Sequence, residues 1–236
     1  MASSLQKLVA TLVMVLMLVP PLLPPPARPK VGPLKIFHDP LLGVHGRMTD
    51  EVEPWKIDLS MDMISAMGAS WLVEYFPWAY MEPEKGRFDW THSDMVVSAA
   101  AARGLKIVAR LDMVPDWARP PGTTSRHLEE DRYADYASFA AVFARRYGGA
   151  VRDIVVWNEP NLNLEWGYRP ADPAAYTRLL KAAYQAIKST DKRMSVVAAG
   201  LAPTLDAGQW GMSDLEFLQK MYETGAKPYF DKLAVH

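Results

Sequence analysis

The residues whose types and spacing point to chemistry lie in the stretch D-I-V-V-W-N-E-P-N, residues 153–161. An apolar, β-branched run without polar alternation is typical of a strand covered on both faces, as in parallel sheets. Pro160 has no N–H to donate and ends that strand. The stretch therefore predicts the carboxylate of Glu159 at the carboxyl end of a buried strand. Beside it, Asn158 can donate and accept hydrogen bonds, as sugar hydroxyls require. An ordinary strand-ending turn would also use Asn and Pro.

Aromatic residues follow a second predicted strand, in the segment P-W-A-Y-M-E-P-E-K-G-R-F-D-W, residues 77–90. A flat ring offers an apolar surface to one face of a pyranose, and an indole N–H can still donate a hydrogen bond. Trp78 and Tyr80 are therefore predicted to contact a sugar. Phe88 and Trp90 are expected to anchor the loop to the core.

The elements that must position these residues alternate between strands and helices. Strands are predicted at 34–38, 71–76, 105–111, 153–156, 194–199 and 230–235, and helices at 55–67, 92–103, 131–147, after Asp172-Pro173 and after Ser213. A Gly-rich loop is expected after the first strand, Asp172 as an N-cap, and a capping box from Ser213 to Glu216. The helix behind that box carries Leu215, Leu218 and Tyr222. This alternation indicates βαβ units and a parallel sheet in an α/β fold.

A doubly wound sheet and a (β/α)₈ barrel share this alternation. No G-x-G-x-x-G motif follows the first predicted strand, and such a motif would mark a dinucleotide site. Polar and aromatic residues follow several different strands, as barrel active sites require. The sequence therefore predicts a (β/α)₈ TIM barrel.

The W-N-E-P motif of residues 157–160 resembles the acid/base signature of clan A retaining glycoside hydrolases, which are (β/α)₈ barrels. The segment 77–90 resembles the W-x-x-I-E-P-x-x-G-x-Y-D-W loop of the same clan, so two separate segments carry the resemblance. The resemblance implies that Glu159 is the general acid/base and that Asn158 binds the sugar 2-hydroxyl.

Other residues are predicted to contact or shape the sugar site on weaker grounds. Asp112 either contacts substrate or forms a structural pair with Arg110, and Trp117 is either a wall of the cleft or a loop anchor. Glu165 is expected to be solvated. The predicted substrate-binding residues besides Asn158 are Trp78, Tyr80, Asp112, Trp117, Trp166 with its neighbour Tyr168 in a further subsite, and His236.

In the clan, a His near the position of His236 lies within reach of a nucleophilic Glu on strand seven. The clan commonly carries an arginine in strand two, where this sequence has Leu72, Val73 and Glu74. Arg110 is a candidate to take its place. Six predicted strands imply a barrel truncated after strand six, which is the N-terminal portion of a retaining enzyme. Such a piece would lack the second carboxylate of the retaining mechanism and be inactive alone. The alternatives are a non-catalytic carbohydrate-binding barrel and a membrane-anchored structural or interaction protein.

The composition limits partners and compartment. The net charge of −1 in 236 residues leaves no basic excess for nucleic acid, and there is no Cys and no metal-ligand spacing of His. Neither a cofactor nor a metal is expected, and the expected partner is a carbohydrate. Residues 1–30 combine Lys7, an apolar run at 8–19 and a proline-rich spacer, which predicts a secretory signal or an uncleaved signal anchor. The catalytic domain is then 31–236, and the protein is expected to be exported, secreted or anchored to the outer face of the membrane.

Overall fold

The computed structural model describes residues 39–205, 208 and 210–236. The chain divides into two units, Met1–Gly32 and Pro33–His236, and every described residue belongs to the second. The predicted signal segment and the predicted strand 34–38 therefore lie outside the described residues. No helix in the described ranges is long and apolar enough to cross a bilayer.

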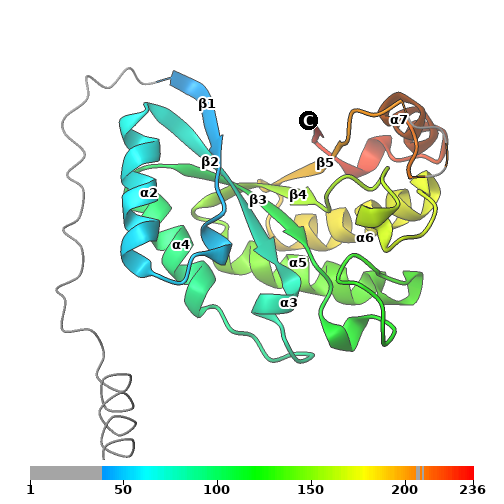
Figure 1. The fold of residues 1–236 in the computed structure, drawn as a ribbon, viewed down its shortest axis with the longest axis horizontal. Helices are drawn as coiled ribbons and strands as arrows, with labels where there is room; N and C mark the ends of the chain where they lie inside the picture. The colour runs from blue at the N-terminus through cyan, green and yellow to red at the C-terminus, as the bar shows by residue number, and fades with distance from the viewer. Residues whose placement is uncertain (1–38, 206–207, 209) are drawn as a thin grey trace, which may run out of the picture. The chain divides into compact units, whose positions relative to one another are not determined.

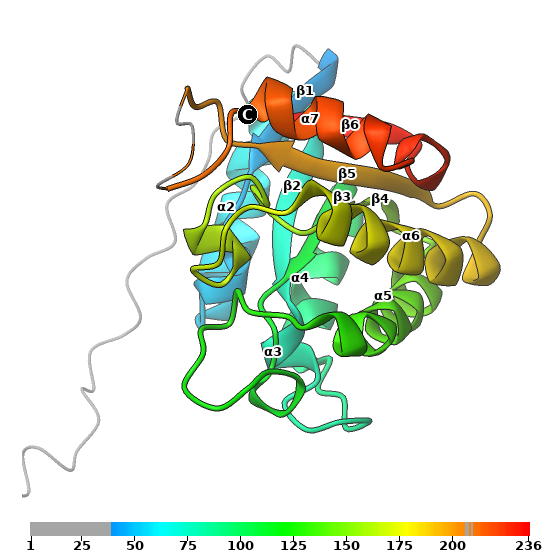
Figure 2. The same cartoon turned by 90° about the vertical axis from the view of Figure 1, so that its right-hand side faces the viewer.

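Six strands form one parallel sheet in which each strand pairs with the next along the chain (Figure 1). They are β1 (Asp39–His45), β2 (Ala69–Pro77), β3 (Lys106–Asp112), β4 (Val151–Val156), β5 (Ser195–Leu201) and β6 (Lys232–Val235). Sequential parallel strands with helices between them are the arrangement of a (β/α)₈ barrel. The described strands make up a curled part of such a barrel, which confirms the predicted fold class (Figure 2).

Helices connect the strands and cover one side of the sheet (Figure 2). They are α2 (Pro54–Ala66), α3 (Trp78–Met81), α4 (Thr91–Ala101), α5 (Tyr133–Tyr147), α6 (Pro173–Thr190) and α7 (Asp214–Glu223). The predicted aromatic stripe of α5 is confirmed, since Tyr136, Phe139 and Phe143 are buried at three- and four-residue steps. Burial of this stripe holds α5 against the sheet.

Two local predictions were wrong. The expected Gly-rich loop after the first strand contains β1 itself, which pairs with β2 from Asp39 onward. Gly43 permits this pairing because its backbone lies close to Trp71. A Cβ added at residue 43 would lie 3.2 Å from the Cβ of Trp71. In α7, the Ser213 side chain makes no capping hydrogen bond, and Leu215 is exposed.

The buried residues of α7 are Phe217 and Met221, and Leu218 packs against the core beside them. By contrast, the N-cap of α6 is confirmed. The carboxylate of Asp172 accepts hydrogen bonds from the backbone N–H groups of Ala174 and Ala175, both at 2.9 Å. Such a cap satisfies donors that the first helical turn leaves unpaired.

The strand register brings the site residues together. Tyr75, Arg110, Val155 and Val197 are direct neighbours across β2, β3, β4 and β5. Side chains directly opposite one another in a sheet point to the same face. Asp112 lies two residues beyond Arg110, on that face and at the carboxyl end of β3.

Candidate active site

The backbone after β4 is strained where the W-N-E-P motif begins. Trp157 and Glu159 have φ values of +74° and +40°, a region that non-glycine residues seldom adopt. The turn is held on both sides, because the Trp157 N–H donates to the Leu111 carbonyl at 3.0 Å and the Glu159 N–H donates to the Gly200 carbonyl at 3.1 Å. Strained residues of this kind gather at functional sites, where the surrounding structure holds them in place.

The residues that flank Asn158 and Glu159 are structural. Trp157 is fully buried, and its indole N–H donates to the Glu165 carbonyl at 2.8 Å. The buried side chain of Asn161 donates to the carbonyls of Ala202 and Met212 and accepts from the Ala202 N–H. These contacts tie the loop after β4 to the loop after β5 and fix the direction in which Glu159 leaves the sheet.

The Glu159 carboxylate is partly exposed, with about a quarter of its side chain accessible (24%). Its Oε1 lies 2.7 Å from Nδ1 of His236, the residue after β6. The imidazole packs over Gly200, since a Cβ on that glycine would lie 2.6 Å from the ring. The resemblance associates this histidine with the nucleophile, whereas here it contacts the expected acid/base.

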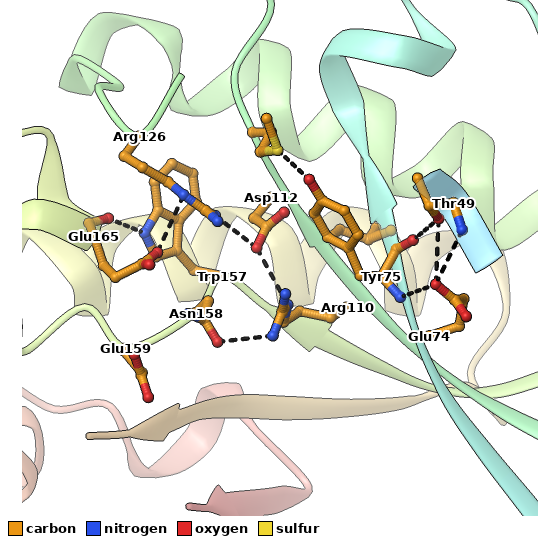
Figure 3. Close-up of polar contacts among 12 residues, drawn as sticks. Thr49, Glu74, Tyr75, Arg110, Asp112, Arg126, Trp157, Asn158, Glu159 and Glu165 are labelled. Atoms are coloured by element: carbon orange, nitrogen blue, oxygen red, sulfur yellow. Dashed lines mark hydrogen bonds and ion pairs between the residues drawn. The ribbon is translucent and has the colours of Figure 1, made fainter. Parts of the chain in front are cut away.

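Five side chains linked in series, called here the polar ring, lie beside Glu159 (Figure 3). Arg110 Nη1 donates to Asn158 Oδ1 at 3.0 Å, and Arg110 Nε lies 3.2 Å from Asp112 Oδ2. Arg126 bridges Asp112 Oδ2 at 2.7 Å and Glu165 Oε2 at 3.1 Å. Figure 3 shows Glu159 standing apart from these contacts.

Asp112 is a structural member of this ring. Its side chain is fully buried between two guanidinium groups, so the structure shows the structural pair with Arg110, extended by Arg126. Burial raises the pKa of Asp112, and the two guanidinium groups oppose that shift. Because the Asp112 side chain has no exposed surface, it cannot contact a sugar in this arrangement.

The prediction that Glu165 is solvated was wrong. Its side chain is 13% exposed and ion-paired with Arg126. Burial raises the pKa of Glu165, while the charge of Arg126 acts in the opposite direction. Sequence reasoning also missed Arg126. This residue lies in the loop after β3 and folds back onto Asp112 at the end of that strand, and no local sequence pattern predicts such a contact.

Most of the predicted sugar-binding aromatic residues are loop anchors. Trp78 is fully buried, its indole N–H donates to Glu82 Oε2 at 2.6 Å, and its ring meets Trp117 edge to face at 5.3 Å. Trp117 is half-buried and donates to the Glu82 carbonyl at 2.8 Å. Trp166 is buried against Trp157 at 5.7 Å. Two of the predicted aromatic residues are exposed, Tyr80 at 55% and Tyr168 in the loop after β4.

Two exposed aromatic side chains lie on the loops that follow β4 and β5. Tyr168 is 71% exposed and Trp210 is 66% exposed. The backbone of Asn163 joins them, because its N–H donates to the Trp210 carbonyl at 2.8 Å and its carbonyl accepts from the Tyr168 N–H at 2.6 Å. Gly211 permits this approach, since a Cβ there would lie 2.6 Å from the Asn161 carbonyl oxygen. Trp210 was not predicted, although an isolated Trp in a loop is a usable signal.

Within the described ranges, no group of three or more His, Asp or Glu side chains has the arrangement of a metal site.

Comparisons with known proteins agree with this fold. Residues 49–147, which are less than half of the chain, match glycoside hydrolase family 42, a family described as beta-galactosidase. Among curated proteins, no sequence matches.

Solved structures match over most of this chain. A family 39 glycoside hydrolase from Bacteroides cellulosilyticus has a TM-score of 0.64 and 22% identity, covering 82% of this chain and 37% of its own. A family 39 beta-xylosidase from Caulobacter crescentus has a TM-score of 0.62 and 22% identity, covering 89% and 48%. An exo-beta-1,4-mannosidase from an Opitutaceae bacterium has a TM-score of 0.52 and 18% identity, covering 66% and 31%.

The chain thus spans less than half the length of each of these three proteins. Their identities, all below 25%, establish likeness of fold. Together with the family match, they confirm the resemblance of this chain to clan A glycoside hydrolases.

Proposed function

We propose that the chain is part of a retaining glycoside hydrolase that cleaves O-glycosidic bonds of oligo- or polysaccharides, with Glu159 as general acid/base. The observation that carries this proposal is the placement of Glu159. Its carboxylate is partly exposed at the carboxyl end of β4, held by a strained turn next to the buried amide of Asn158. Active sites of (β/α)₈ enzymes lie at this end of the strands.

In the proposed reaction, Glu159 protonates the glycosidic oxygen while a second carboxylate attacks the anomeric carbon. Glu159 then removes a proton from the water that hydrolyses the glycosyl-enzyme intermediate. The two carboxylates of such enzymes lie about 5 to 5.5 Å apart. Asn158 contacts the sugar beside the acid/base, where a hydrogen bond to a hydroxyl can strengthen in the transition state.

The carboxylates that neighbour Glu159 in the described part of the chain are unsuited to that attack. Asp112 is fully buried between Arg110 and Arg126. Glu165 is ion-paired with Arg126. These pairings support a nucleophile supplied outside the described residues, at the seventh strand that the clan resemblance implies.

We therefore expect the 236-residue chain alone not to hydrolyse glycosides. The measurement is release of nitrophenol from aryl β-xylosides, β-galactosides and β-mannosides, the sugars named for the similar proteins. The matched variant is Glu159→Ala. Turnover above the blank that this variant abolishes would show that a carboxylate of this chain serves as nucleophile, and the proposed division of roles would be wrong.

The same chain should still bind carbohydrate. Exposed aromatic rings on loops next to an acid/base suit stacking against sugars, so Tyr168 and Trp210 are proposed to hold a sugar on the leaving-group side. We expect Trp210→Ala and Tyr168→Ala each to weaken binding of xylo-, galacto- or manno-oligosaccharides several-fold. Isothermal titration calorimetry measures this, with Tyr222→Ala on α7, an exposed aromatic of another element, as control.

These binding experiments also separate the alternatives. A non-catalytic carbohydrate-binding barrel would bind the same oligosaccharides, but no complete form of the protein would show hydrolysis that depends on Glu159. A structural or interaction protein would bind none of them. Equal affinity of the wild type and both aromatic variants would remove Tyr168 and Trp210 from the site.

A further inference from the structure

A cavity of about 420 Å³ lies at the end of the sheet opposite Glu159. Its lining residues come from the first positions of successive strands, among them Lys106 at the start of β3 and Ser195 at the start of β5. The register places them side by side. Trp71 of β2 is the partner of Lys106, and Asp153 of β4 is the partner of Ser195. Glu159 follows the carboxyl end of β4, so this cavity is separate from the proposed active site.

Positive charge predominates around this cavity, called here the basic cavity. Its four basic side chains are Lys106, Arg152, Arg193 and Lys232. Arg193 pairs with Asp191 at 3.0 Å. Lys232 pairs with the buried carboxylate of Asp153. Two carboxylates therefore face four cations, which leaves an excess of two positive charges in a chain whose net charge is −1.

The two remaining cations carry that excess. The Lys106 ammonium lies over the Trp71 ring, 4.9 Å from its centre. The charge of Arg152 acts on Asp191, whose carboxylate is already bound by Arg193. Neither Lys106 nor Arg152 forms an ion pair with a residue that the structure describes. Both side chains are exposed, so water solvates them until a ligand with negative charge binds.

The Ser195 hydroxyl is a second observation that points to a ligand. Its oxygen is buried and has no hydrogen-bond partner among the described residues. A buried hydroxyl without a partner destabilises a fold, because it has lost its hydrogen bonds to water. Such groups are rare in native proteins and are commonly explained by a bound ion, a water molecule or a function. An acceptor atom in the basic cavity would satisfy Ser195.

We propose that the basic cavity binds a doubly charged oxyanion, of which sulfate and phosphate are the simplest forms. Lys106 and Arg152 supply the charge that the anion neutralises, and the Ser195 hydroxyl donates a hydrogen bond to one of its oxygens. Ammonium and guanidinium groups form short, charge-assisted hydrogen bonds to such oxygens. A dianion cancels the excess of two positive charges. This proposal is independent of the proposed function, because the residues involved lie at the opposite ends of the strands.

Isothermal titration calorimetry of the 236-residue chain with sodium sulfate tests the proposal, with sodium chloride holding the ionic strength constant. We expect a saturable isotherm with one site. Lys106→Gln and Arg152→Gln should each weaken binding about tenfold or more, the effect of losing a hydrogen bond to a charged group. Both residues are exposed, so these variants should fold like the wild type. The control is Arg145→Gln, an exposed arginine of α5 outside the cavity, which should bind like the wild type.

The variant Ser195→Ala separates a ligand-binding hydroxyl from a structural one. Without sulfate, it should unfold in urea at or above the wild-type midpoint, because it removes an unpaired buried group. With sulfate, it should gain less stability than the wild type, since a ligand of the folded state stabilises according to its affinity. Sulfate also stabilises folded proteins in general. The gain that remains in Lys106→Gln measures this general effect.

Unsaturable heats with sulfate, or equal affinities of the wild type and the two glutamine variants, would overturn the proposal. A Ser195→Ala midpoint well below the wild type without sulfate would show that the hydroxyl already has a partner, and its role as a donor would be wrong. Galactose 6-sulfate tests the source of the anion. Tighter binding than sulfate, lost in Lys106→Gln, would assign the site to a sulfated sugar, and weaker binding would assign it to the free ion.

Discussion

Replacing Glu159 with Ala is expected to slow the hydrolysis of alkyl glycosides by a factor on the order of 10² to 10⁴ in an enzyme that carries the complete barrel, the loss typical of a missing general acid. Activated aryl glycosides should lose far less in the glycosylation step, because a good leaving group departs without protonation. Steady-state rates on the two substrate types measure the difference. Added azide should restore turnover of the aryl substrates and give a β-glycosyl azide, since an anion needs no general base.

The control for this experiment is Glu130→Ala, which removes an exposed glutamate paired with Arg178. It should leave both rates unchanged. Equal losses on alkyl and aryl glycosides in Glu159→Ala would mean that Glu159 is not the acid/base. The buried turn would then be a structural feature of the fold.

The variant Asp112→Ala is expected to lower the free energy of unfolding by about 3 to 5 kcal/mol, the usual cost of removing one partner from a buried ion pair. Asp112 is fully buried and is the shared partner of Arg110 and Arg126. Its loss leaves two guanidinium groups in a poorly solvated site with Glu165 as the remaining carboxylate of the polar ring. Urea unfolding should show a lower midpoint with an unchanged slope.

The matched control is Asp116→Ala, four residues along the chain. Asp116 also pairs with an arginine, Arg119, but its carboxylate is 91% exposed. Exposed ion pairs contribute little because water solvates both partners, so this variant should unfold at nearly the wild-type midpoint. A similar midpoint for both variants would show that the polar ring does not stabilise the end of β3.

The parts of the site that were predictable from sequence depend on local rules. The β-branched run before Trp157 and the missing N–H of Pro160 place the end of β4 within a few residues, and β4 ends at Val156. The α5 stripe and the Asp172 cap follow from helical periodicity and from the donors of the first turn, which are properties of neighbouring residues. Strands and helices in alternation then imply the parallel sheet.

The misassigned residues are those whose environment depends on distant segments. Trp78 and Trp166 have the ring chemistry of sugar-binding residues, but packing against Trp117 and Trp157 buries them. Glu165 is charged and lies in a loop, as solvated glutamates do. It is buried because Arg126, 39 positions earlier, lies against it.

By itself, the sequence determined the class of fold and the strand end at which Glu159 and Asn158 stand, because strand termination, capping and helical periodicity are set by adjacent residues. Only the tertiary structure decided which polar groups share the polar ring, which aromatic rings remain exposed, and that His236 lies 2.7 Å from Glu159. The physical reason is that burial and charge pairing depend on which loops meet at the ends of the strands. These contacts between loops join residues tens of positions apart, and no local sequence pattern predicts them.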